Sequence, residues 1–144
     1  MEILNYALAA LVVSTGLILG KILARIAKEE IKPGEKYFLI IQKSLFCAVI
    51  VFLMYLNKTN VHYIWIGGLI IFTYLLYFKK INPAVLSAVL GLAVYLSSKT
   101  DYFVVISSLT FLYWLPVGTL MKKKKEIALN LIVFLIVAIG LFIL

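Results

Sequence analysis

The sequence predicts an all-α protein, a bundle of six transmembrane helices joined by short loops. Three observations support this fold class: the composition, the lengths of the apolar runs and the positions of the charges between them. Of the 144 residues, 65% are hydrophobic and 14% are charged, and the mean hydropathy is +1.11. A soluble domain is about half apolar and about a quarter charged. The composition therefore excludes an ordinary soluble globule, a disordered chain and a disulfide scaffold.

Apolar runs long enough to cross a bilayer recur along the whole chain. A helix needs about 20 apolar residues to span a hydrocarbon core of ~30 Å. The first run covers residues 3–20. Cations at a spacing that places them on one helix face follow it, so we expect the helix to extend to Ile31. Pro33-Gly34 then breaks the helical pattern. The further spans are expected at 38–56, 61–78, 83–97, 102–121 and 127–144. Residues 1–144 then form a single integral membrane domain with little chain left for a soluble part.

Proline and asparagine mark the start of the fourth span. Asn82 can accept a hydrogen bond from the first turn of a helix, and Pro83 suits the first helical position because its missing N–H would have no partner there. The sequence therefore predicts that this span begins at Pro83.

Charges between the spans predict the orientation of the chain. Most Lys and Arg lie in the connections after spans 1, 3 and 5: Lys21, Arg25, Lys28, Lys32, Lys36, Lys79, Lys80, Lys122, Lys123, Lys124 and Lys125. The connections after spans 2 and 4 hold only Lys58 and Lys99. Basic connections remain in the cytoplasm. We therefore expect a multi-pass protein of the cell membrane with both termini outside.

The net charge of +8 raises the question of an acidic partner. The short loops leave no room for a basic groove with aromatic side chains, so nucleic acid is not expected. The run Lys122 to Lys125 fits a role in topology and can attract anionic lipid. The expected partners are thus the bilayer with its anionic lipids, and a membrane protein or a second copy of the chain.

Small residues recur every four positions in spans 1 and 4, which lets helix backbones approach closely in lipid. In span 1 these are Gly16, Gly20 and Ala24, and in span 4 they are the pairs Ala84 and Ala88, and Ser87 and Gly91. Residues 37–41 also resemble residues 102–106. One interpretation is an inverted repeat of two three-helix halves, as in many transporters. The other is simple helix packing together with chance similarity in a small apolar alphabet.

Polar residues inside the spans are the main candidates for ligand contacts. Gln42, Lys43 and Ser44 form one cluster in span 2. A charge within a span is costly and so suggests function, although Lys43 can also extend its amine to the nearby interface. Ser107, Ser108 and Thr110 can form a polar seam in span 5, or bond back to their own helix.

Candidates at the membrane interface are few. Glu29 and Glu30 can bind a cation or a partner, or simply form a solvated, salt-bridged helix end. His62 can shuttle protons, or be an ordinary interfacial histidine. The single cysteine, Cys47, is expected to be a packing residue, and no catalytic residue, metal site or cofactor is predicted.

Three functions remain open from the sequence. The first is a non-enzymatic accessory, assembly or scaffold component of a membrane complex, in line with the absence of deep acidic residues and of soluble parts. The second is a small homo-oligomeric transporter or channel, which the Lys43 cluster and the possible repeat would favour. The third is a lipid-modifying enzyme that uses Glu29, Glu30 or His62.

Overall fold

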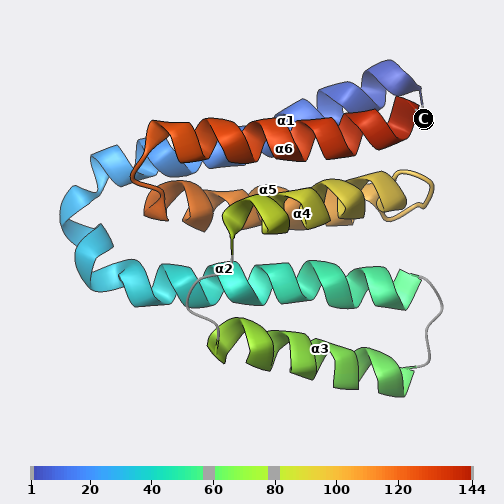
Figure 1. Cartoon of the computed structure of the whole chain (residues 1–144), viewed down its shortest axis with the longest axis horizontal. Coiled ribbons are helices and arrows are strands. Elements are labelled where there is room, and N and C mark those ends of the chain that lie inside the picture. The colour runs from blue at the N-terminus through green and yellow to red at the C-terminus, as the bar shows by residue number, and fades with distance from the viewer. Residues whose placement is uncertain (1, 57–60, 78–81, 144) are drawn as a thin grey trace.

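The computed structural model describes residues 2–56, 61–77 and 82–143, and the chain is 91% helical with no strand among the described residues. Figure 1 shows that the helices lie roughly along one common axis and alternate in direction. This confirms the all-helical prediction. The helices are α1 (Ile3–Ile26), α2 (Lys28–Leu56), α3 (Val61–Tyr77), α4 (Pro83–Ser97), α5 (Phe103–Leu120) and α6 (Lys124–Ile143).

Four helices, α1, α2, α5 and α6, are long and apolar enough to cross a membrane. Within the described ranges 61–77 and 82–143, helices α3 and α4 are apolar and have 17 and 15 residues. At 1.5 Å per residue they measure about 26 Å and about 22 Å, less than a typical ~30 Å hydrocarbon core. The start of α4 is as predicted, because the Asn82 side chain accepts a hydrogen bond of 3.0 Å from the Ala84 N–H and Pro83 is the first helical residue.

The junction between α1 and α2 differs from the prediction. The first helix ends at Ile26 rather than at Ile31, and the chain bends at Ala27, which has φ −104° and ψ 42°. Pro33 and Gly34 lie inside α2. A proline there removes one hydrogen-bond donor but leaves the other turns intact, so it does not end the helix. Figure 1 shows the chain reversing direction over the first turns of α2.

The remaining boundaries shift by a few residues. Helix α5 begins at Phe103, and α6 begins at Lys124, three residues before the expected start of span 6. Glu126 then lies in the first turn of α6, where a negative charge stabilises the helix dipole. Residues 78 and 144, together with Lys58, Lys79 and Lys80, lie outside the described residues.

The helices pair in an order that does not follow the sequence. Helix α1 packs most extensively on α5, α4 packs on α6, and α2 packs on α5, while α3 packs mainly on α2 at one edge of the bundle (Figure 1). The third helix of the first half, α3, thus lies against the second helix, α2. The third helix of the second half, α6, instead lies against the first helix of that half, α4. The two halves are arranged differently, so the fold does not show the inverted repeat.

Glycines allow the backbones of α1 and α5 to touch. A Cβ atom added to Gly16 would lie 2.6 Å from the Phe111 carbonyl oxygen. A Cβ on Gly20 would overlap the Leu115 carbonyl oxygen, and one on Gly118 would overlap that of Leu17. Because backbone atoms cannot rotate away as side chains do, these positions require glycine at this contact.

We predict that Gly20→Ala destabilises the bundle. The new methyl group must push α5 away, at a cost of about 1–3 kcal/mol, or a fall of roughly 5 °C in the unfolding midpoint. Circular dichroism during heating in detergent measures the unfolding midpoint. Gly140→Ala is the matched control, because a Cβ there meets nothing within 4 Å. Equal midpoints for the two variants would contradict the glycine contact.

Candidate functional site

Asn130 connects α4 and α6 through a buried polar contact. Ser87 Oγ lies 2.8 Å from Asn130 Oδ1 and 2.8 Å from the Pro83 carbonyl oxygen, so its one proton is shared between two acceptors. Asn130 Nδ2 donates to the Glu126 carbonyl oxygen at 2.7 Å. Asn130 and Ser87 are both fully buried. The Asn130 side chain therefore has hydrogen-bond partners within the protein, and it links α6 to α4.

A tyrosine and a lysine make further contacts between helices. Tyr6 Oη in α1 donates to the Ala138 carbonyl oxygen in α6 at 2.9 Å. Lys21 Nζ donates to the Met121 carbonyl oxygen at 2.5 Å, at the end of α5. The sequence reasoning did not single out these partners. One feature of the sequence could have indicated such contacts: a tyrosine, an amide or a lysine lies in an apolar run. In such a run a polar side chain tends to form a hydrogen bond with another helix.

The three residues of the α2 cluster have different environments. Gln42 Nε2 donates to Tyr113 Oη in α5 at 3.3 Å. Lys43 is half-buried and has no hydrogen bond or ion pair to any described residue, while Ser44 is exposed. Since successive helix residues point about 100° apart, the three side chains do not converge on one ligand position.

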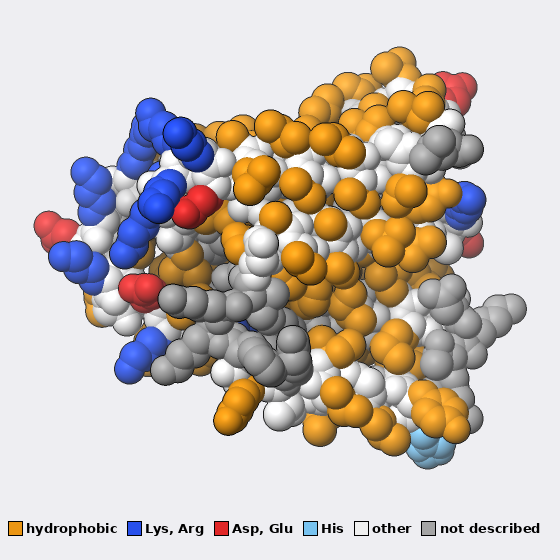
Figure 2. All heavy atoms as spheres, in the orientation of Figure 1, with side chains coloured by type: hydrophobic (Ala, Val, Ile, Leu, Met, Phe, Trp, Pro, Cys, Tyr) orange, Lys and Arg blue, Asp and Glu red, His pale blue; other side chains and the backbone are white. Residues whose placement is uncertain are grey.

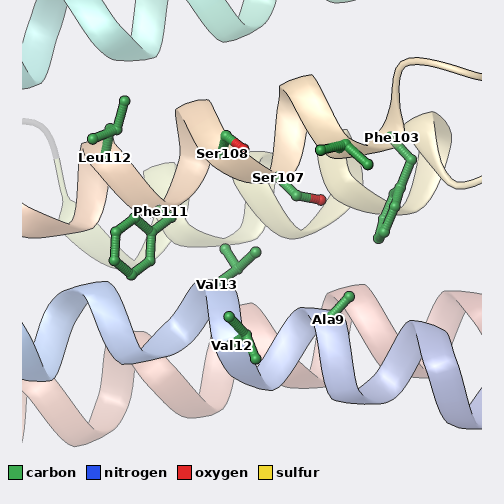
Figure 3. A pocket seen from close by; sticks show the side chains of 9 residues that line it. Ala9, Val12, Val13, Phe103, Ser107, Ser108, Phe111 and Leu112 are labelled. Carbon is green, nitrogen blue, oxygen red and sulfur yellow. The ribbon is translucent and has the colours of Figure 1, made fainter.

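The serines of α5 line a groove between α1 and α5, which we call the α1–α5 groove (Figure 3). Its volume is about 550 Å³. Its walls comprise Ala9, Val12 and Val13 from α1, and Phe103, Val104, Ser107, Ser108, Phe111 and Leu112 from α5. Thr110 is buried outside the groove and donates to the Ile106 carbonyl oxygen at 2.8 Å. No residue of α2 lines the groove, so the cluster of Gln42, Lys43 and Ser44 and this pair of serines do not form one site.

The interfacial candidates lie far apart. Glu29 and Glu30 are exposed in the first turn of α2, and neither forms an ion pair with a described residue. His62 is exposed at the start of α3, which lies at the opposite end of the bundle from the α1–α2 junction (Figure 1). The structure therefore does not bring the carboxylates and the imidazole together. Among the described residues there is also no group of three His, Cys, Asp or Glu that could hold a metal ion.

Two of the small residues of α4, Ser87 and Gly91, contact α6. A Cβ on Gly91 would lie 2.8 Å from the Phe134 carbonyl oxygen, so α4 and α6 approach closely at this point. Ala84 and Ala88 in α4, and Ala24 in α1, are half-buried.

Positive charges gather at the end of the bundle where α1 meets α2 and α5 meets α6. Figure 2 shows blue side chains crowded at that end and few at the other. The four lysines from Lys122 to Lys125 are exposed, with one weak ion pair of 3.9 Å between Lys123 and Glu126. A smaller hollow of about 200 Å³ lies there, lined in part by Lys21, Lys28, Glu35 and Lys122.

No family model, curated protein or solved structure matches the chain.

We predict that the contact between Ser87 and Asn130 stabilises the bundle. In a double-mutant cycle with Ser87→Ala and Asn130→Ala, the coupling free energy should be about 0.6 kcal/mol and no more than about 1.7, the range for hydrogen bonds between membrane helices. Denaturant unfolding in mixed micelles measures it. A cycle with Ser14→Ala in place of Ser87→Ala is the control, because Ser14 bonds to Leu11 of its own helix. A coupling no larger than in this control would contradict the role.

Proposed function

We propose that the chain is a non-enzymatic component of a membrane complex, with an accessory, assembly or scaffold role. One observation carries the proposal: polar groups in the bundle interior, such as Gln42 with Tyr113 and Ser87 with Asn130, are bonded to one another across helix interfaces. A catalyst needs ionisable groups within reach of a common reacting atom. Here such groups lie mostly at the two ends of the bundle, so the interior is suited to holding helices together.

The proposed placement is six spans in the cell membrane, with both termini outside. The helices alternate in direction, and the start of α1 and the end of α6 lie at the same end (Figure 1). The opposite end carries the exposed cations Arg25, Lys28, Lys32 and Lys36 together with the lysines from Lys122 to Lys125 (Figure 2). The positive-inside rule then places that end in the cytoplasm. Lysines there also attract anionic lipid, at about 1 kcal/mol each.

Cysteine labelling tests the placement, and Lys79 is the decisive position. Six spans place it inside, whereas four spans, with α3 and α4 not crossing, leave it outside. In a Cys47→Ala background, we expect Lys79→Cys and Lys123→Cys to react with a membrane-impermeant maleimide only after permeabilisation. Thr100→Cys should react in intact cells, as the positive control. Labelling of Lys79→Cys in intact cells would reduce the number of spans to four.

Purification from the native membrane tests the proposed role. We expect native mass spectrometry of the tagged chain, extracted in mild detergent, to show a second membrane protein at fixed stoichiometry. Co-expression of two differently tagged copies controls for self-association. A chain that purifies alone and conducts a solute in liposomes would contradict the proposal.

A small anion channel or carrier is the second candidate, and Lys43 favours it. A lysine that lies half-buried among apolar helices without a bonding partner in the described structure can attract an anion. For this function, wild-type protein in liposomes should release trapped chloride, and Lys43→Met should reduce the rate about tenfold or more. Lys36→Met is the matched control, because Lys36 is an exposed lysine of the same helix. Equal chloride efflux in liposomes with Lys43→Met and with wild-type protein would exclude this candidate.

A further inference from the structure

Ser107 differs from the other buried hydroxyls of the described structure. In a membrane helix a serine or threonine usually satisfies its hydroxyl by donating to a carbonyl of its own helix. Ser107 is only 9% exposed, and its Oγ has no hydrogen-bond partner. The other buried serines and threonines donate to a carbonyl three or four residues earlier: Ser14, Ser87, Ser97, Thr110 and Thr119.

The unpaired hydroxyl faces the α1–α5 groove. Figure 3 shows Ser107 on the side of α5 that faces α1, with its oxygen directed toward the space between Phe103 and Ala9. A buried hydroxyl without a partner costs about 1–3 kcal/mol. The only other buried side-chain atom without a partner in the described residues is Trp114 Nε1, and Trp114 does not line the groove. The groove therefore lacks a hydrogen-bond acceptor at one defined point.

The groove opens sideways onto the apolar outer surface of the bundle. Among its wall residues, Val12 is 63% exposed, Val104 is 70% exposed and Leu112 is 44% exposed. A volume of about 550 Å³ is in the range of ligand sites, and the walls are almost entirely apolar. Under the proposed membrane placement, this opening faces acyl chains and not water.

Length and polarity along the groove match one leaflet of a bilayer. From Phe103 to Leu112 the helix rises about 14 Å, close to half of a ~30 Å hydrocarbon core. Ser107 lies only about 6 Å from the start of α5, whereas Phe111 and Leu112 line the part farther along the helix. Ser107 thus lies in the half of the groove nearer the membrane surface, and Phe111 and Leu112 reach toward the middle of the bilayer. A phospholipid presents its ester carbonyls and its chains in the same order.

We propose that the α1–α5 groove binds one acyl chain of a phospholipid from the outer leaflet. The Ser107 Oγ atom is covered in the lipid-free chain, so the side chain rotates toward the groove and then donates a hydrogen bond to an ester carbonyl oxygen of that lipid. This site depends on the proposed membrane placement but not on the proposed partner complex. The lipid buries the apolar walls and supplies the acceptor that Ser107 lacks.

Photo-crosslinking in vesicles tests the site. The protein is reconstituted in phosphatidylcholine vesicles that contain a small fraction of a phosphatidylcholine with a diazirine in one acyl chain. After irradiation, mass spectrometry maps the labelled peptides. We expect label to concentrate on residues 9–13 and 103–112, relative to the exposed apolar residues of α6. Label spread evenly over all apolar faces would overturn the proposal.

Three variants test separately the Ser107 hydrogen bond, the free volume of the groove and the effect of removing an unrelated hydroxyl. Ser107→Ala removes the hydrogen bond, worth about 1 kcal/mol, so label in the groove should fall about fivefold. Ala9→Phe fills the groove and should abolish its label, with helix content checked by circular dichroism. Ser14→Ala is the matched control, because it removes a buried hydroxyl that is already bonded to Leu11. Groove label as strong in Ser107→Ala as in Ser14→Ala would overturn the role of Ser107, and this comparison remains decisive if Ala9→Phe fails to fold. The separate maleimide labelling of Lys79→Cys, Lys123→Cys and Thr100→Cys in cells shows whether the membrane placement holds.

Discussion

The contact between the backbones of α1 and α5 is the constraint on which the rest of the bundle depends. Gly16, Gly20 and Gly118 allow two helix backbones to meet without intervening side chains. In lipid, where apolar side chains gain little by leaving their surroundings, such close van der Waals contact is a main source of helix association. Helix α5 can then present Tyr113 to α2, while α6 packs on both α1 and α4. The α1–α5 groove lies beside this close contact, nearer the start of α5 than the glycine crossing.

Polar residues then determine which helices pair. Apolar surfaces in a membrane fit many partners almost equally well. A buried amide or hydroxyl restricts the choice, because a wrong pairing leaves it without a partner. Asn130 with Ser87 joins α6 to α4, and the Tyr6 hydroxyl with the Ala138 carbonyl joins α1 to α6. Ser107 departs from this pattern, since its hydroxyl lies on the side of α5 that faces α1 but has no hydrogen-bond partner there.

Local sequence signals predicted the helices better than their arrangement. Apolar runs located the helices, and the Asn82-Pro83 pair located the start of α4 to the residue. The same kind of signal misplaced the first break: Pro33-Gly34 was expected to end the first helix, but that helix ends at Ile26 and Pro33 lies inside α2. Spacing of small residues indicated that α1 and α4 have close contacts, but it could not identify the partners, which lie about a hundred residues away for α1 and about forty for α4. The orientation of the Ser107 hydroxyl is set by packing between two helices, and no periodicity in one helix contains that information.

The distance along the chain between α1 and α5 has a consequence for biosynthesis. Lys21 and its partner Met121 are 100 residues apart. At about 5–20 residues per second, α5 emerges from the ribosome roughly 5–20 s after α1. During that interval α1 must stay in the membrane with its glycine face uncovered, while α2 and α3 can already form their hairpin. Helices α5 and α6, the last to be made, thus complete the bundle around α1. A chain truncated before α5 would leave the glycine face of α1 exposed to other helices inserted nearby.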